Sequence, residues 1–314
     1  MMRMRPLMAG VELGGTKCIC VIGTGPDDIR DQVWLPTASP EVTLGSIVSV
    51  LDAWSHQYGA PESIGVASFG PLDLRKESPT FGRITASAKE GWRDVRVLET
   101  LSRGRSSTVG FNTDVNAAAL AEGRWGAAQG LADFAYVTVG TGVGVGIVAN
   151  GALVGGCHHA ELGHIRVARL TGDTWAGSCV FHGDCVEGLA SGPAIRARVG
   201  QPAEEIDSDH EVWEPVADAL GQLLHTLVFA TAPRRILIGG GVVAGRPELL
   251  DRVRHRLLCS INGYIDVEAM TGGVDRYVIA PGLGVSAGPL GALALAADAA
   301  ESVMHTNKLP IAKP

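Results

Sequence analysis

The segment Asn112-Thr113-Asp114-Val115-Asn116 carries side chains able to take part in proton transfer. It lies where an apolar, strand-like stretch at 108–112 gives way to a helix-like stretch that begins at Asn116. A carboxylate at the end of a strand can accept the proton of an attacking hydroxyl, as phosphoryl transfer to an alcohol requires. The same residue types also allow Asp114 or Asn116 to be the N-cap of the helix. Asp114 is therefore a candidate base whose assignment depends on its surroundings.

Three glycine-rich turns form a second group of candidates. Gly14-Gly15-Thr16-Lys17 and Gly140-Thr141-Gly142 each join two short apolar strands. Glycine lets backbone N–H groups approach an anion closely, and threonine adds a hydroxyl donor. Each turn alone is as readily an ordinary hairpin turn, but two similar turns in separate parts of the chain indicate phosphate binding. Neither has the GxxxxGK[ST] pattern of a P-loop.

The third turn, Gly239-Gly240-Gly241, follows a strand-like stretch at 235–238. Its backbone could lie flat against a nucleotide base, and it could equally be the entry to a helix.

Two cysteines and two histidines have the residue types and spacing of a metal site. Cys179, His182 and Cys185 read Cys-x₂-His-x₂-Cys, and His164 lies upstream. Two thiolates and two imidazoles close a tetrahedron around zinc with no open position, which is typical of a structural site. The alternative is a pair of unliganded cysteines beside an exposed His182. The remaining cysteines receive no role: Cys18, Cys20, Cys157 and Cys259.

Glu161 and Glu187 flank this metal segment. Glutamate is usually a solvated surface residue. Close to a binding site, however, its carboxylate accepts hydrogen bonds from sugar hydroxyls, so both residues are candidate sugar ligands.

Bulk properties limit the class of protein. A chain of 314 residues favours two domains. Hydrophobic residues make up 46% and charged residues 19%, and no apolar run approaches the roughly 20 residues of a membrane span. The net charge is −7 and no basic block is present, which argues against nucleic acid and membrane partners. No export signal is recognisable, so we expect a cytoplasmic protein with reduced cysteines that acts on small molecules.

The hydrophobic pattern predicts an α/β chain in which a strand–turn–strand unit occurs twice. The expected strands lie at 7–11, 17–22, 63–69, 108–112, 134–139, 143–149 and 235–238. The expected helices lie at 44–58, 95–101, 116–123, 212–231, 247–259 and 288–303. The last residues, 307–314, are expected to be a frayed tail.

Taken together, these motifs resemble the ROK family of sugar kinases over nearly the whole chain. In chain order, they resemble a first phosphate motif (10–17), a catalytic segment (112–117), a second phosphate motif (140–144), a sugar and zinc segment (161–164 with 179–187) and an adenosine motif (239–241). Glu12, the Cys-x₂-His-x₂-Cys run and the stretches at 68–73, 78–79 and 91–92 are similar to the bacterial fructokinase branch. The stretch Ala86-Ser87-Ala88-Lys89 departs from the Thr-Pro-Lys usual in the family.

The resemblance implies an actin-like ATPase (ribonuclease H-like) fold, with two α/β domains around an interdomain cleft. We expect domains at 1–115 and 116–287, the second holding the zinc segment, and a C-terminal helix at 288–314 that packs on the first. The resemblance also implies a homodimer that uses ATP and Mg²⁺.

The implied reaction is phosphorylation of a hexose, with fructose favoured and fructose 6-phosphate as product. Asp114 would be the base, and Glu12 would orient Mg²⁺ through water. The resemblance assigns the following residues to phosphate and nucleotide binding: Gly14, Gly15, Thr16, Lys17, Gly140, Thr141, Gly142, Gly239, Gly240 and Gly241. It assigns the following residues to sugar binding: Asn112, Glu161, His164, Glu187 and Gly70. His164 would serve both zinc and sugar, one ring nitrogen to each.

Two alternatives stay open. One is a kinase for mannose, glucose or an N-acetylhexosamine, because substrate choice depends on a few pocket contacts. The other is a sugar-binding transcriptional regulator, which the negative net charge and the position of the first glycine motif near residue 10 disfavour.

Overall fold

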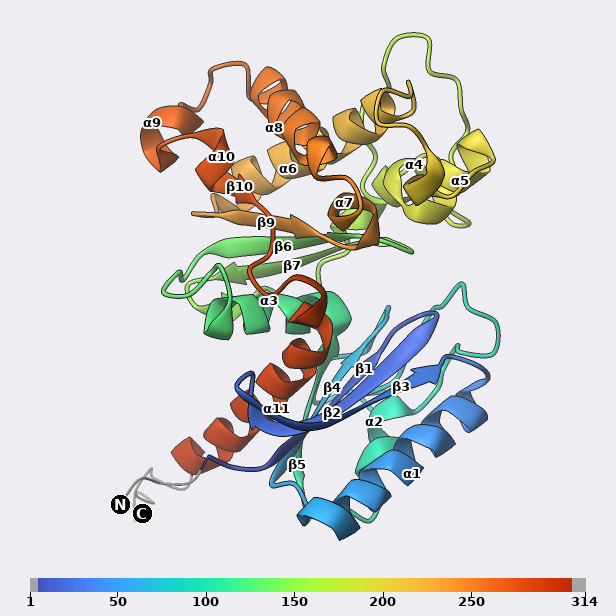
Figure 1. Cartoon of the computed structure of the whole chain (residues 1–314), viewed down its shortest axis with the longest axis vertical. Helices are drawn as coiled ribbons and strands as arrows, with labels where there is room; N and C mark the ends of the chain where they lie inside the picture. Colours follow the sequence, from blue (N-terminus) through green and yellow to red (C-terminus); the bar gives the residue numbers. More distant parts are fainter. Residues whose placement is uncertain (1–4, 307–314) are drawn as a thin grey trace. The chain divides into compact units, whose positions relative to one another are not determined.

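The computed structural model describes residues 5–306, which form two compact α/β units (Figure 1). The first unit contains the chain up to Trp125, the short segment Gly155–His159 and the chain from Ser286 onward. The second contains Gly126–Val154 and Ala160–Val285. Each unit has a five-stranded sheet of its own.

The sheet of the first unit has the order β3-β2-β1-β4-β5. Its strands are β1 (Met8–Leu13), β2 (Lys17–Gly25), β3 (Asp28–Pro36), β4 (Ser63–Ser68) and β5 (Thr108–Thr113). β1, β2 and β3 pair antiparallel, whereas β4 and β5 run parallel to β1. The carboxyl ends of the parallel strands lie at one edge of the sheet, so the residues that follow β1 and β5 come together there.

Helices cover both faces of this sheet (Figure 1). They are α1 (Pro40–Tyr58), α2 (Val97–Ser102), α3 (Asp114–Trp125) and α11 (Ala287–Thr306). Alternate residues of β1, namely Ala9, Val11 and Leu13, share a core with α1. The opposite face of the sheet packs on α11.

A row of three glycines lets α11 come close to the sheet. Gly10, Gly65 and Gly110 are direct neighbours on β1, β4 and β5. A Cβ added to Gly65 would overlap the carbonyl oxygen of Ala292 in α11. The helix backbone therefore occupies the space that side chains would fill, and any larger residue in the row must displace it.

The sheet of the second unit has the order β10-β9-β6-β7-β8. Its strands are β6 (Phe134–Val139), β7 (Val143–Ala149), β8 (Ala152–Leu153), β9 (Ile236–Gly239) and β10 (Val278–Ile279). The helices are η1 (Leu162–His164), α4 (Val186–Ala190), α5 (Gly192–Val199), η2 (Ala203–Glu205), α6 (Trp213–Thr231), α7 (Gly241–Ala244), α8 (Pro247–Ile261), α9 (Val267–Thr271) and α10 (Val274–Tyr277). A 3₁₀ turn, η3 (Gly284–Ser286), precedes α11. α6 carries buried residues at the three- and four-residue spacing of an amphipathic helix, and it packs on α8 over the sheet.

The structure confirms the two hairpins and the main helices expected from the sequence, and it adds β3, which the pattern did not predict. The first unit extends to Trp125 where the sequence suggested a boundary at 115, because α3 packs against α11. α11 belongs to the first unit, where it packs on α3 and on the sheet. The expected tail at 307–314 lies outside the described residues.

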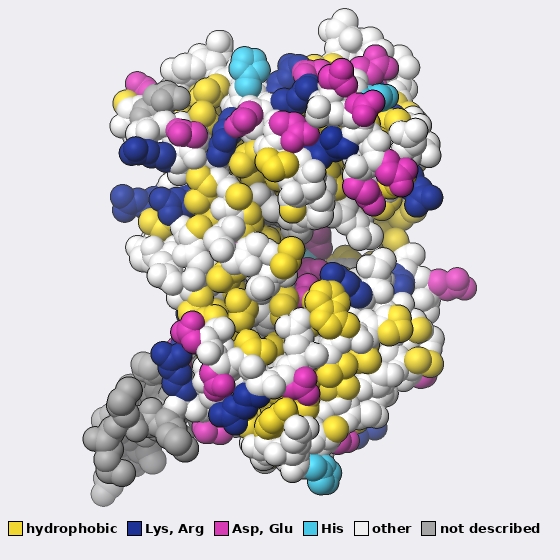
Figure 2. All heavy atoms as spheres, viewed as in Figure 1, with side chains coloured by type: hydrophobic (Ala, Val, Ile, Leu, Met, Phe, Trp, Pro, Cys, Tyr) yellow, Lys and Arg dark blue, Asp and Glu magenta, His cyan; other side chains and the backbone are white. Residues whose placement is uncertain are grey.

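Among the described residues, no helix combines the length and apolar character needed to cross a membrane. On the face drawn in Figure 2, Lys and Arg side chains are interspersed with Asp and Glu.

Candidate active site and metal centre

Asp114 is the first residue of α3 and directly follows β5. The N-cap hydrogen bond of this helix comes from its neighbour, because the Thr113 hydroxyl oxygen accepts from the Asn116 N–H at 3.2 Å. Helix capping therefore does not require Asp114. One of its carboxylate oxygens, Oδ1, accepts the N–H of Val115 at 2.8 Å. Burial raises the pKa of Asp114 to about 6, although this hydrogen bond acts to lower it.

Asn112 is held in one orientation beside this base. Its amide oxygen accepts from the N–H of Thr113 and from Nδ2 of Asn116, both at 2.9 Å. With the oxygen engaged twice, the Nδ2 group is the donor that Asn112 can offer to a ligand. This orientation suits a contact with a sugar hydroxyl oxygen.

Glu12, on β1, is a second carboxylate in the first unit with a perturbed acidity. Burial and the charge of Asp114 raise its pKa to about 7, and Lys17 acts in the opposite direction. Within the described part of the chain, Oε2 of Glu12 is buried and has no hydrogen-bond partner. A Cβ added to Gly288, in the first turn of α11, would overlap this carboxylate. A buried carboxylate oxygen of this kind suits a cation such as Mg²⁺ with its bound water.

The turn at Gly14–Lys17 is held by backbone bonds and by Thr37. The Gly14 N–H donates to the Lys17 carbonyl at 3.1 Å, so this amide is used inside the turn. The Thr37 hydroxyl donates to the Gly14 carbonyl at 2.7 Å. Thr16 and Lys17 are exposed, and the Lys17 ammonium lies over the ring of Trp34 at 4.4 Å. Gly15 and Thr16 are therefore the positions from which this turn can offer amides and a hydroxyl to phosphate.

The turn at Gly140–Gly142 and the run Gly239–Gly241 lie side by side in the second unit. Gly240 has φ 90° and packs on the end of β6 so closely that a Cβ would lie 2.5 Å from the Val139 nitrogen. A Cβ on Gly140 would lie 3.8 Å from the nitrogen of Gly241. The carbonyl of Gly140 accepts from the N–H of Gly192 at the start of α5 at 2.8 Å. The structure thus brings together two of the turns that the sequence assigns to the nucleotide.

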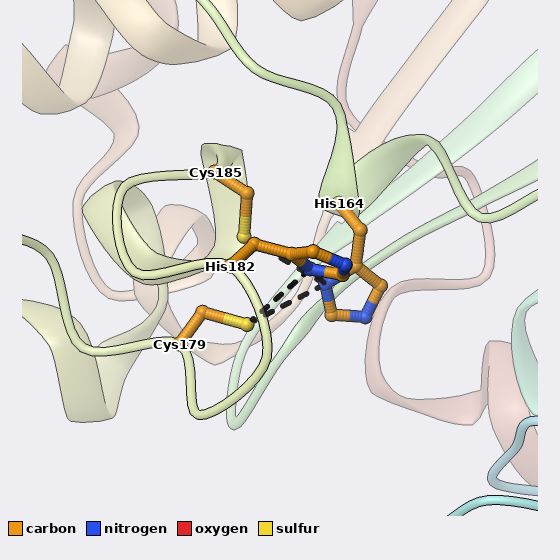
Figure 3. A group of neighbouring side chains, drawn as sticks. All are labelled: His164, Cys179, His182 and Cys185. Carbon is orange, nitrogen blue, oxygen red and sulfur yellow. Dashed lines mark hydrogen bonds between the residues drawn. The ribbon is translucent and has the colours of Figure 1, made fainter.

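Four side chains converge to form the candidate metal centre (Figure 3): His164, Cys179, His182 and Cys185. Their ligand atoms all lie within 4.8 Å of one another. The two Nδ1 atoms are 3.3 Å apart. Sγ of Cys179 lies 3.7 Å from each Nδ1, and Sγ of Cys185 lies 3.7 Å from Nδ1 of His164. In a tetrahedral site with Zn–N bonds of about 2.1 Å and Zn–S bonds of about 2.3 Å, two nitrogen ligands lie about 3.4 Å apart, and a sulfur and a nitrogen ligand lie about 3.6 Å apart. The donor set and its spacing therefore suit zinc.

Local structure explains why these residues meet. Cys179 and Gly183 exchange two backbone hydrogen bonds, of 3.1 and 2.9 Å, which close a tight knuckle around His182. Cys185 is fully buried at the start of α4, and burial raises its thiol pKa to about 11. His182 is exposed, yet its Nδ1 points into the cluster.

Glu187 connects the metal centre to the second glycine turn. Its Oε1 lies 4.0 Å from Nε2 of His164, and its Oε2 accepts the N–H of Val143 at 3.2 Å. A Cβ on Gly142 would lie 2.6 Å from Oε2. Since Nδ1 of His164 faces the cluster, Nε2 is the nitrogen left for a second ligand, as the dual role requires. Glu161 precedes η1, and its carbonyl accepts the His164 N–H at 3.0 Å.

Gly70 lies in the loop after β4, within the first unit, and its Cα faces the ring of His159. The predicted site residues accordingly fall into two sets, one in each unit.

The comparisons with known proteins agree with these motifs. The sequence pattern of the ROK family matches residues 8–299. The chain belongs to the ROK family. The fructokinase of Zymomonas mobilis is 38% identical to this ROK protein, over 91% of this chain and 95% of its own. The fructokinase of Pediococcus pentosaceus is 35% identical, over 92% and 97%.

Solved structures support the fold. The ROK hexokinase from Thermus thermophilus superposes on this ROK protein with a TM-score of 0.75 at 27% identity, covering 94% of this chain and 99% of its own. A ROK family glucokinase from Streptomyces griseus, in complex with glucose and AMPPNP, gives 0.71 at 24% identity. The family and the actin-like α/β fold expected from the sequence are confirmed.

Sequence reasoning missed two residues of this ROK protein that the structure places against the candidate site. Thr37 fixes the first glycine turn, and His159 contacts the Gly70 loop. Both act across long sequence separations, so no local spacing pattern indicates them.

Proposed function

We propose that this ROK protein transfers the γ-phosphoryl group of ATP to fructose, giving fructose 6-phosphate and ADP. The observation that carries the chemistry is Asp114, a half-buried carboxylate with a raised pKa on the first residue of a helix whose cap comes from Thr113. The fructokinases that are 35–38% identical over most of the chain support fructose as the sugar.

The reaction needs a base for the sugar hydroxyl. The oxygen of the sugar 6-hydroxyl bonds to the γ-phosphorus of ATP while Asp114 accepts the proton of that hydroxyl. At the same time the bond between the γ-phosphorus and the oxygen that bridges to the β-phosphate breaks, which releases ADP. With a pKa of about 6, Asp114 is largely ionised at neutral pH and is a stronger base than an exposed aspartate. Asn112 orients the sugar through its amide donor.

Phosphate binding falls to the glycine turns at 14–17 and 140–142, and the run at 239–241 takes the adenosine. Mg²⁺, when bound with ATP, neutralises charge on the phosphates. Glu12 is the residue we assign to its water shell, because Oε2 is buried and otherwise without a partner in the described chain.

We assign the cluster of His164, Cys179, His182 and Cys185 to a structural zinc. The four donors leave no open position, so this metal would hold the loop and not enter the reaction. His164 then keeps Nε2 for a sugar hydroxyl, next to Glu187. Glu161 and Gly70 complete the proposed sugar contacts. A homodimer in the cytoplasm is the state that the family resemblance favours.

The test is a panel of initial rates of ADP formation with zinc-replete protein, on fructose, mannose, glucose and N-acetylated hexoses. We expect the highest kcat/KM on fructose. A preference for another hexose would overturn the assigned sugar but keep the mechanism, and no turnover of any hexose would favour a sugar-binding regulator.

The role of Asp114 needs a variant. Asp114→Asn should lower kcat by about 10²- to 10⁴-fold, the usual contribution of a general base, while fructose affinity changes little. A variant within about tenfold of the wild-type kcat would exclude Asp114 as the base.

A further inference from the structure

A short antiparallel ribbon follows Gly70 in the first unit. Residues 71–73 pair with 83–85 through two backbone hydrogen bonds, of 3.0 and 2.8 Å, which flank the opposed pair Leu72 and Ile84. In such a pair the backbone groups of the two central residues point away from each other. The N–H of Leu72 therefore faces outward from the ribbon, and the ribbon itself cannot satisfy it.

The side chain of His159 accepts this hydrogen bond. The distance from the Leu72 nitrogen to Nε2 of His159 is 3.0 Å, and the bond is buried. Only 3% of Leu72 and 4% of His159 are exposed, so water cannot replace the imidazole. A backbone N–H can only donate, so Nε2 carries the lone pair and a neutral ring carries its proton on Nδ1.

The same imidazole packs against Gly70. A Cβ added to Gly70 would lie 3.3 Å from Cε1 and 3.4 Å from Nε2 of His159. The next residue after the bonded amide, Asp73, is fixed independently, because its carboxylate accepts from the Arg75 side chain at 2.9 Å and from the Ser78 and Thr80 hydroxyls. His159 is therefore one of the groups that hold the Gly70–Leu72 backbone, and Asp73 anchors its far end.

The position of His159 in the chain gives this contact a functional meaning. His159 ends the segment Gly155–His159 of the first unit, and the chain enters the second unit at Ala160. Glu161, a proposed sugar ligand, follows one residue later, and η1 ends at His164. The hydrogen bond from Leu72 thus ties the Gly70 loop to a residue that lies two positions before Glu161 in the chain.

We propose that His159 is a positioning residue for the sugar: by accepting the Leu72 N–H it holds the Gly70–Leu72 backbone, and with it the proposed sugar contact at Gly70, in place. This inference rests on the proposed sugar kinase function. Because the contact that His159 supports, Gly70, is assigned to the sugar and not to the nucleotide, loss of its acceptor should weaken sugar binding and leave ATP binding unchanged.

The test compares three variants. His159→Gln places an amide oxygen near the position of Nε2, His159→Asn is polar but too short to do so, and His159→Leu has no acceptor. His56→Leu is the control, because His56 is exposed on α1 and bonds only to a carbonyl of its own helix. Steady-state KM for fructose and for ATP, kcat and thermal melting are measured for each.

We expect His159→Asn and His159→Leu to raise KM for fructose by about tenfold, the effect of an unsatisfied buried N–H, with KM for ATP within about twofold. His159→Gln should restore KM for fructose to within about threefold of wild type. Equal changes in both KM values, or no difference between the Gln and Asn variants, would overturn the proposal. If His159→Leu does not fold, the difference in KM for fructose between His159→Gln and His159→Asn still tests the proposal.

A measurement without substrate separates this inference from the assignment of fructose. Hydrogen exchange of the Leu72 amide should be slow in the wild type and in His159→Gln, and faster by about tenfold or more in His159→Asn. A wild type that turns over no hexose but shows this pattern would refute the proposed function and leave the hydrogen bond intact. Exchange that does not differ among the variants would refute the role of His159.

Discussion

Replacing Glu12 with glutamine should make the protein more stable at alkaline pH while impairing its activity. The wild-type carboxyl is buried, its Oε2 has no partner in the described chain, and its pKa rises from 4.5 to about 7. Between pH 4.5 and about pH 7, the Glu12 carboxyl therefore keeps its proton in the folded state but has released it in the unfolded state. Stability falls as pH increases through this window, and the loss is complete above about pH 7.

The magnitude follows from the size of the pKa change. A rise from 4.5 to about 7 corresponds to at most about 3 kcal/mol of unfolding free energy. Glu12→Gln keeps the shape of the side chain and removes the titration. The gain should therefore approach this limit at pH 8 and shrink to about 0.4 kcal/mol at pH 4.5, where the wild-type carboxyl is about half protonated in the unfolded chain.

The assay is urea unfolding of both proteins at pH 8 and pH 4.5, followed by circular dichroism. Glu62→Gln is the matched control, because Glu62 is an exposed residue of the same unit and should show no such pH dependence. Rates with MgATP and fructose should fall in Glu12→Gln because the group assigned to the Mg²⁺ water shell is lost. A gain of equal size at both pH values, or a loss at pH 8, would show that the burial of Glu12 does not act as described.

Three further outcomes are expected. Because we assign the role of base to ionised Asp114, whose pKa is about 6, kcat/KM should fall about tenfold between pH 8 and pH 5, and a flat profile would exclude this carboxylate. Elemental analysis should find about one zinc per wild-type chain, and Cys185→Ser should lose the metal and melt several degrees lower; wild-type protein free of zinc would rule out the metal centre. Gly65→Ala should destabilise the protein by about 1–3 kcal/mol because its methyl group meets the α11 backbone, and an unchanged unfolding midpoint would contradict the close packing seen at that strand.

The sequence predicted the parts of the site that depend on local spacing. The apolar run of β5 followed by alanine-rich α3 placed Asp114 at the junction of a strand and a helix, and the structure has it there. The choice between base and N-cap was beyond the sequence, because Thr113, Asp114 and Asn116 are all good capping residues. The hydrogen bond from the Asn116 amide to Thr113 assigns the cap to Thr113, and the role of Asp114 as base stays a prediction.

Features that depend on contacts across the chain were not predictable. β3 is an edge strand that alternates between half-buried and exposed positions and carries Asp28, Arg30 and Asp31, so it lacks a strong apolar pattern. His159 stands beside another histidine, and its partner at Leu72 is 87 residues away. The end of the first unit at Trp125 depends on the packing of α3 against α11, which begins more than 150 residues after the start of α3.

The row of glycines under α11 has a consequence for the order in which the two units fold during translation. The sheet of the first unit emerges early from the ribosome, but the helix that covers Gly10, Gly65 and Gly110 is made only after the whole second unit. All residues of the second unit precede that helix. The usual order, in which an amino-terminal domain folds first, is therefore reversed: the second unit can complete its core on the nascent chain, while the first waits with an open groove until α11 is released.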